Sequence, residues 1–342
     1  MKAKKLPSGS WRCQAYAGGE RKSFTAPTKK EAELMAIEWQ NGKRSKPKAV
    51  TLGQAVKEYI ESKENLLSPS SVRGYYIIYE NAIEAIKDIP LAQVNEKALQ
   101  GWVNENSIRY SPKSVKGQYG LVTAALRQNK INLDFKSVLL PRIPKKEPVI
   151  PTEEQIGQIL RMIEGTSVEL PVTIAVVLGL RQSEIAALKW SDYDGSMLDI
   201  HAAVVPNKEN RYIYKNSTKS AASTRKIEVD GILKDRLDRA ERKSEFISPM
   251  LPSSVLRKFN HLCDKNGLPR FTMHAQRHGN ASLMLANGVP DKYAMARLGQ
   301  SSPNMIKNVY QHLYEAKEKE FANTLNNKFS EIIAHGIAHD KK

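Results

Sequence analysis

The chain has 342 residues and carries 53 lysines and arginines against 36 acidic residues, a formal net charge of +17. This length allows two or three domains, and the charge favours a polyanionic partner, most commonly nucleic acid, with a generally basic soluble protein as the alternative. A mean hydropathy of −0.49 argues against a membrane protein, and two widely separated cysteines suggest neither a disulfide framework nor a zinc cluster.

Residues 1–48 are predicted to form a small basic module. They hold 12 lysines and arginines but only 4 glutamates, and two alternating segments at 11–17 and 21–26 flank a Gly-Gly turn as in a β-hairpin. A capping-box pattern from Thr28 to Glu31 then starts a helix. The exposed ribbon would fit a DNA major groove, and the alternative is a charged appendage without a groove of its own. This helix is expected to run through Ala32, Met35, Ala36 and Trp39.

Residues 51–135 are predicted to form a bundle of four helices. Helix-start signals recur at Thr51, Ser68-Pro69, Asn95 and Ser111-Pro112, and serine followed by proline is typical of a helix N-terminus. Four helices in a segment of this size make a small bundle. The polar stretch at 42–50 precedes it as a linker, and four prolines between 136 and 151 prevent a helix there and indicate a second linker.

Residues 152–342 are expected to form a third domain that is mostly helical. A capping box from Thr152 to Gln155 opens it, and a strand-rich stretch with turn signals interrupts the helices between about residues 197 and 229. The predicted fold class is therefore mainly α with small β elements. It comprises a module of two or three strands and a helix, a four-helix bundle, and a mixed, mostly helical domain.

Four short patterns in the third domain carry chemistry. Gly179-Leu180-Arg181 followed by Glu184 places an arginine at a corner between two helices. His274 and Arg277, three residues apart, share one face of a predicted helix. The other two patterns are polar: Thr218-Lys219-Ser220 with Ser223 and Arg225 at the start of an alternating strand, and Leu298-Gly299-Gln300 with Tyr310 ten residues after Gln300 and His312 just beyond.

Taken together, these residues resemble the tyrosine recombinase (phage integrase) family. That family has an arginine in a G-L-R-x-x-E corner, a lysine on a β-hairpin, an H-x-x-R-H motif, an L-G-H-S-like segment and a tyrosine ten residues on. The resemblance covers about residues 150–315, with order and spacing matching throughout. Regions 1–48 and 51–135 look like the family's arm-binding and core-binding (SAM-like) domains, as in integrases of temperate phages and conjugative transposons, and region 152–342 like its catalytic domain with a C-terminal tail.

The resemblance implies the catalytic roles. Arg181 and Arg277 would bind the non-bridging oxygens of a DNA phosphate, because two guanidinium groups can stabilise charge in the transition state. Tyr310 would attack the phosphorus and form a 3′-phosphotyrosyl ester that keeps the bond energy. Lys219 is the expected general acid, with Lys215 and Lys226 as rivals, and His274 would assist proton transfer from Tyr310.

Three further residues have weaker assignments. Glu184 is expected to hold the arginine corner, and His278 to pack or orient its neighbours. Gln300 occupies the place where the family usually has histidine or tryptophan. Its amide can still donate a hydrogen bond to a phosphate oxygen, so activity is expected to be retained. The resemblance implies no cofactor and no metal, and no third ligand accompanies His274 and His278.

The expected function is site-specific recombination that integrates and excises a mobile element. The resemblance implies double-stranded DNA attachment sites as substrates, a homo-tetramer on DNA, and an excisionase and a host DNA-bending protein as possible partners. No apolar stretch follows the N-terminal lysines, so no secretion signal is expected and the protein should act on DNA in a bacterial cytoplasm. The alternatives are a non-catalytic sequence-specific DNA-binding protein and a type IB topoisomerase-like enzyme. Phe329, Ile332 and Ile333 near the C-terminus are predicted to dock onto a neighbouring protomer or onto their own domain.

Overall fold

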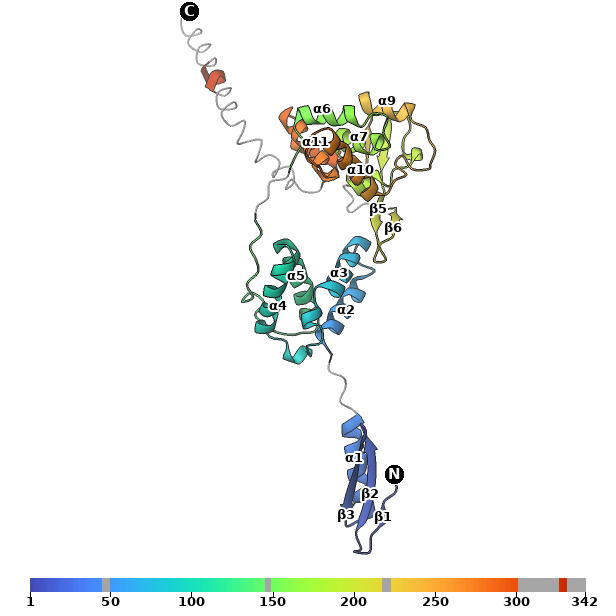
Figure 1. The fold of residues 1–342 in the computed structure, drawn as a ribbon, viewed down its shortest axis with the longest axis vertical. Helices are drawn as coiled ribbons and strands as arrows, with labels where there is room; N and C mark the ends of the chain where they lie inside the picture. The colour runs from blue at the N-terminus through green and yellow to red at the C-terminus, as the bar shows by residue number, and fades with distance from the viewer. Residues whose placement is uncertain (45–49, 145–148, 217–222, 301–325, 331–342) are drawn as a thin grey trace, which may run out of the picture. The chain divides into compact units, whose positions relative to one another are not determined.

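The computed structural model describes residues 1–44, 50–144, 149–216, 223–300 and 326–330. Figure 1 shows a small sheet with one helix near the N-terminus, then a bundle of helices, then a larger mixed region. Within these ranges no helix combines the length and the apolarity that a bilayer span needs. The prediction of a mainly helical fold with small β elements is confirmed.

The N-terminal module is a three-stranded antiparallel sheet covered on one face by a helix. Its strands, β1 (Lys4–Lys5), β2 (Trp11–Ala17) and β3 (Glu20–Ala26), lie in the order β1-β2-β3, and α1 (Lys29–Arg44) follows. The prediction allowed for a third strand but gave it no position, because the two residues of β1 are too few for alternation to be visible. The buried stripe of α1 runs through Ala32 and Ala36, whereas Met35 is 45% exposed.

The second region contains the four predicted helices. They are α2 (Leu52–Lys63), α3 (Pro69–Asn81), α4 (Glu96–Arg109) and α5 (Pro112–Gln128), with short 3₁₀ turns at Glu84–Ile86 and Leu91–Gln93. The predicted caps are present: the Thr51 hydroxyl accepts from the backbone of Gln54, and Asn95 and Ser111 cap α4 and α5. The start signals in the sequence therefore fix the helix boundaries by satisfying N–H groups that have no partner within the helix.

The third region is helical around two short antiparallel ladders. Its helices are α6 (Glu153–Met162), α7 (Glu169–Leu178), α8 (Gln182–Ile185), α9 (Gly231–Arg239), α10 (Pro252–Lys265), α11 (Met273–Ala286) and α12 (Asp291–Leu298), with a 3₁₀ turn at Trp190–Asp192. Strands β4 (Met197–Ile200) and β7 (Arg225–Glu228) pair with each other, as do β5 (Ala203–Pro206) and β6 (Tyr212–Lys215). The predicted capping box at Thr152 and Gln155 is formed.

Helix α7 lies in the middle of this region and explains how the site residues are placed. Its sequence is apolar on every side, as expected for a helix surrounded by protein. Helix α11 packs against it, and the amide nitrogen of Asn280 on α11 donates to the carbonyls of Val176 and Val177, both at 2.9 Å. These bonds satisfy carbonyls of the last turn of α7, which have no partner within the helix, and so hold α11 beside the end of α7.

Candidate active site at the end of helix α12

The corner after α7 is built around Gly179. This residue has a φ of 63°, and a Cβ there would lie 2.6 Å from Cδ2 of Leu298 and 2.9 Å from Oδ1 of Asn280. Glycine alone meets both conditions without strain. The chain then turns directly into α8, for which Arg181 is the N-terminal cap residue.

Arg181 and Glu184 form one local unit at this corner. The Glu184 carboxylate accepts from the Arg181 backbone N–H at 3.1 Å and from Arg181 Nη1 at 2.5 Å. Glu184 is 2% exposed, whereas 29% of the Arg181 side chain is accessible. A buried carboxylate therefore holds the guanidinium while part of that group still faces outward, where an anionic ligand can reach it.

Arg277 comes to the same corner from α11. Its Nη1 donates to the Gly179 carbonyl at 2.8 Å and its Nη2 to the Leu298 carbonyl at 2.7 Å, and the side chain is 1% exposed. Burial lowers the pKa of Arg277 to about 9, with the charge of Arg181 as the next cause, so the guanidinium stays protonated at neutral pH. Two arginines that are 96 positions apart (277 − 181) thus concentrate positive charge in one place.

Three consecutive carbonyls at the end of α12 each accept from a different arginine. Arg225 Nε donates to the carbonyl of Arg297 at 2.7 Å, Arg277 Nη2 to that of Leu298 at 2.7 Å, and Arg181 Nη2 to that of Gly299 at 2.9 Å. Carbonyls at a helix C-terminus lack partners within the helix and carry the negative end of its dipole, so cations are favoured there. The end of α12 and these side chains therefore form one polar group, the arginine cluster, which consists of Arg181, Glu184, Arg225 and Arg277 with these three carbonyls.

Arg225 is the member of this cluster to which the sequence analysis gave no role. It is the first residue of β7, 8% of its side chain is exposed, and its Nη2 lies 3.2 Å from Oε2 of Glu184. Ser223, fully buried, accepts from Arg181 Nη1 through its hydroxyl at 3.2 Å. The sequence contains only an indirect signal for Arg225: a cation at the start of a buried strand needs a buried partner of opposite charge or a hydrogen-bond acceptor.

His274 and His278 lie next to each other on α11, with ring centroids 4.6 Å apart and the rings edge to face. Burial lowers the pKa of His274, and the charges of Arg277 and Arg181 lower it further. Burial is also the main reason why the pKa of His278 falls to about 4, with His274 and Arg277 contributing. Both imidazoles are therefore neutral at neutral pH, the form in which His274 can accept a proton.

The structure describes six of the eight predicted site residues. It brings together Arg181, Glu184, His274, Arg277 and His278, and the half-buried Gln300 follows Gly299 directly. Lys219 lies outside the described residues, in the connection between β6 and β7, and Tyr310 also lies outside them. The described hairpin is β5–β6, which turns at residues 207–211 rather than at the lysine.

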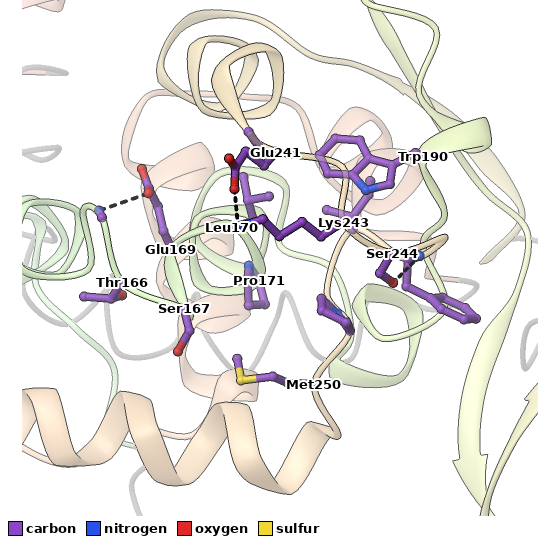
Figure 2. A pocket seen from close by; sticks show the side chains of 15 residues that line it. Thr166, Ser167, Glu169, Leu170, Pro171, Trp190, Glu241, Lys243, Ser244 and Met250 are labelled. Carbon is purple, nitrogen blue, oxygen red and sulfur yellow. Dashed lines mark hydrogen bonds and ion pairs between the residues drawn. The ribbon is translucent and has the colours of Figure 1, made fainter.

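A separate cavity of about 590 Å³ lies between the start of α7 and the loop after α9, and shares no lining residue with the arginine cluster (Figure 2). Its charged groups have partners within the protein: Glu169 accepts from Gly165 N–H at 3.0 Å and pairs with Arg239 from outside the lining, and Glu241 pairs with Lys243. These groups are already satisfied within the protein, which makes the cavity a poor candidate for a polar active site.

The chain matches known families and proteins along most of its length. Residues 151–317 match the model of the Phage integrase family, and residues 51–107 match that of the Phage integrase N-terminal SAM-like domain. The Tyrosine recombinase XerC-like protein of Caldanaerobacter subterraneus subsp. tengcongensis is 25% identical, over 90% of this chain and 92% of that protein. Tyrosine recombinase XerA of Thermococcus onnurineus is 27% identical, over 78% and 96% respectively.

Solved structures show the same fold. The Tn1549 transposon integrase in complex with transposon right end DNA has a TM-score of 0.65 at 18% identity and covers 79% of this chain and 99% of that one. A lambda integrase dimer bound to a COC′ core site has a TM-score of 0.60 at 18% identity and covers 90% and 93%. The two family models match in the order predicted from the sequence, and the first spans both Arg181 and Tyr310. The chain belongs to the phage integrase family of tyrosine recombinases and is a DNA recombinase.

Proposed function

We propose that Arg181, Arg277, His274, Lys219, Gln300 and Tyr310 form one active site that cleaves and rejoins DNA through a 3′-phosphotyrosyl intermediate. The observation that carries the proposal is the arginine cluster at the end of α12. Arg181 donates to the carbonyl of Gly299, which precedes Gln300 and lies eleven positions (310 − 299) before Tyr310 in the sequence. Glu184 and His278 support this site from within the protein.

The chemistry follows from the residue types. The Tyr310 oxygen attacks the phosphorus, the bond from phosphorus to the 5′-oxygen breaks, and the tyrosine becomes a 3′-phosphodiester. His274, neutral at neutral pH, takes up the phenolic proton, and Lys219 gives a proton to the departing 5′-oxygen. Arg181 and Arg277 neutralise the charge on the non-bridging oxygens, and the Gln300 amide donates a hydrogen bond there. The reverse reaction, with a 5′-hydroxyl from another strand, completes the exchange.

The two other regions are proposed to bind DNA at different sites. Residues 51–135 are proposed to act as the core-binding domain and residues 152–342 as the catalytic domain. Residues 1–48 act as the arm-type domain. On β2 the side chains of Arg12, Gln14 and Tyr16 are exposed while the alternate residues are buried under α1, and Arg21 pairs in register with Tyr16 across to β3. This polar ribbon fits a major groove.

The assembled enzyme is proposed to be a tetramer on two DNA sites. The integrases whose structures resemble this chain include a lambda integrase tetramer bound to a Holliday junction. We infer the same assembly here, in the integration and excision of a mobile element in the bacterial cytoplasm, with an excisionase and a host DNA-bending protein as accessory partners. The C-terminal residues around Phe329, which is 55% exposed, are proposed to contact a neighbouring protomer.

A suicide substrate tests the proposed nucleophile. An attachment-site duplex with a nick beside the scissile phosphate loses the short 5′-hydroxyl fragment after attack, so the protein–DNA ester accumulates and runs slowly on a denaturing gel. Wild type should form this adduct, and Tyr310→Phe should form none because it lacks the attacking oxygen. Tyr293→Phe, which changes a 70% exposed tyrosine on α12, is the matched control and should react like wild type.

Three results would contradict the proposal. An adduct that persists in Tyr310→Phe would remove Tyr310 from the role of nucleophile. A wild-type protein that shifts the mobility of its site but forms no adduct would indicate a non-catalytic DNA-binding protein. Relaxation of plasmids of any sequence would instead indicate a topoisomerase-like enzyme.

A further inference from the structure

Arg225 is a buried cation whose nitrogens are all bound to protein. Nε donates to the Arg297 carbonyl at 2.7 Å, Nη1 to the Ser223 carbonyl at 2.7 Å, and Nη2 to Glu184 Oε2 at 3.2 Å. All three guanidinium nitrogens of Arg225 are thus engaged, whereas the more deeply buried Arg277 keeps an Nε without a hydrogen-bond partner among the described residues. The contacts of Arg225 join β7, α8 and the end of α12.

The Glu184 carboxylate is shared between two arginines. Oε1 accepts from Arg181 Nη1 at 2.5 Å, and Oε2 lies 3.2 Å from Arg225 Nη2. Because the carboxylate is nearly inaccessible, both of its oxygens depend on protein donors. Removal of Arg225 would leave Oε2 with the Arg181 backbone N–H and free Glu184 to shift toward Arg181. The direction in which Arg181 points is thus set partly by Arg225.

The same guanidinium packs against the turn that ends α12. Gly299 has a φ of 62°, and a Cβ there would lie 2.6 Å from Arg225 Nη1 and 2.9 Å from its Cζ. The turn can come this close only because glycine has no side chain. Gln300 follows at once, and its N–H donates to the Met295 carbonyl at 3.0 Å, which closes the turn. Arg225 therefore fixes the point at which the chain leaves α12 toward Tyr310.

The charges agree with a supporting role. Burial lowers the pKa of Arg225, while Glu184 raises it and Arg181 and Arg297 lower it. Two guanidinium groups share one carboxylate, so this part of the cluster keeps one net positive charge for an incoming phosphate. Arg225 contributes to this net positive charge although only 8% of its side chain is exposed.

We propose that Arg225 is a positioning residue that clamps Glu184 and the last turn of α12, and thereby directs the Arg181 guanidinium at the scissile phosphate. The proposal rests on the proposed function, in which Arg181 binds a phosphate oxygen. It predicts that loss of Arg225 slows attack without removing a substrate contact. Binding of DNA, which depends on many other phosphate contacts, should change little.

The test compares two suicide substrates that differ only at the scissile position, a phosphodiester and an uncharged methylphosphonate. The methylphosphonate carries one negative charge less, so it depends less on a correctly aimed Arg181. Arg225→Met should lower the rate of adduct formation on the phosphodiester by about 100-fold and on the methylphosphonate by less than about tenfold. Arg181→Met should show the same pattern. DNA affinity of Arg225→Met should stay within about threefold of wild type.

Arg236→Met is the matched control. Arg236 is also a buried arginine of this region, with an ion pair to Glu169 at 3.1 Å and hydrogen bonds to Thr173 and the Leu160 carbonyl, but it lies outside the arginine cluster. Its loss can lower the amount of folded protein, which reduces both rates by the same factor. The ratio of the two rates is measured within one variant and is independent of the folded fraction.

Arg225→Lys provides a second, milder variant. It keeps the charge, but one ammonium cannot reproduce the separate directions of the three bonds, so the phosphodiester rate should fall by about tenfold. The inference is overturned if Arg225→Lys and Arg225→Met react like wild type, or if Arg225→Met loses rate equally on both substrates, as Arg236→Met should. Absence of an adduct in wild type would instead overturn the proposed function itself.

Discussion

Gln276 precedes Arg277 on α11, and its side-chain amide is buried without hydrogen-bond partners among the described residues. The residue is 1% exposed. A buried polar group without a partner costs about 1–3 kcal/mol. Gln276→Met, which keeps the length of the side chain and removes the amide, should therefore raise the free energy of unfolding by about 1–2 kcal/mol in urea titrations.

Asn280→Leu on the same helix is the matched control for that change. The Asn280 amide nitrogen donates to two carbonyls of α7, so this variant should lower the free energy of unfolding. If both variants destabilised the protein to the same extent, the unsatisfied amide of Gln276 would not be the cause.

His278 should make the folded state sensitive to acid. Its pKa is about 4 in the folded protein against an ordinary value of 6.5, so the unfolded chain binds a proton first as the pH falls. The stability it contributes is complete above about pH 6.5 and is lost toward pH 4, by at most about 3 kcal/mol. His278→Phe cannot titrate, and its free energy of unfolding should fall less steeply over that range.

The measurement is a series of urea titrations from pH 7 to pH 4. Gln276→Met serves as the control, because it should shift the whole curve without changing its slope. A curve for His278→Phe parallel to that of wild type would show that this histidine does not carry the acid sensitivity.

At the scale of elements, the corner after α7 depends on one backbone conformation and one close contact. Gly179→Ala combines a φ of 63° with a Cβ 2.6 Å from Leu298, so the side chains of α11 and α12 must move. The expected loss is about 1 kcal/mol for the backbone and a further 1–3 kcal/mol for overpacking. DNA cleavage should fall as well, because Arg277 bonds the Gly179 carbonyl.

Gly165→Ala separates the cost of the backbone conformation from the cost of the close contact. Gly165 has a φ of 68°, and nothing lies within 4 Å of the position of its Cβ. Its substitution should cost only the backbone part, about 1 kcal/mol, and leave cleavage unchanged. Equal losses in the two variants would mean that packing against Leu298 and Asn280 contributes nothing.

At the scale of the whole molecule, the charge is expected to act through separate DNA-binding surfaces. Replacing both Arg12 and Arg21 by alanine in the full chain should weaken binding to arm-type DNA. The slope of log affinity against log salt should decrease by about one for each lost phosphate contact. Adduct formation on a core-site suicide substrate should stay unchanged, because the ribbon is not part of the catalytic machinery.

Lys30→Ala controls for net charge. Lys30 is exposed on α1, the helix that covers the opposite face of the sheet, so its loss should leave the salt slope on arm-type DNA unchanged. Fluorescence anisotropy at several salt concentrations measures both slopes. Because Lys30→Ala removes one charge and the ribbon variant removes two, the decreases are compared per charge, and an equal decrease per charge would indicate a diffuse field rather than a groove-binding ribbon.

The sequence by itself determined the elements, because their signals are local. Caps such as Asn95, Ser111 and Thr152 satisfy N–H groups within three residues of themselves, and alternation along β2 needs only neighbours. It also supplied the family, since spacing within a motif is local information, and it predicted Arg181, Glu184 and Arg277, which the structure brings together. Only the tertiary structure decided that Arg225 joins the arginine cluster and that three arginines bind three successive carbonyls. Those bonds join residues as far as 118 positions apart, and burial at such distances depends on how helices pack, which no short pattern records.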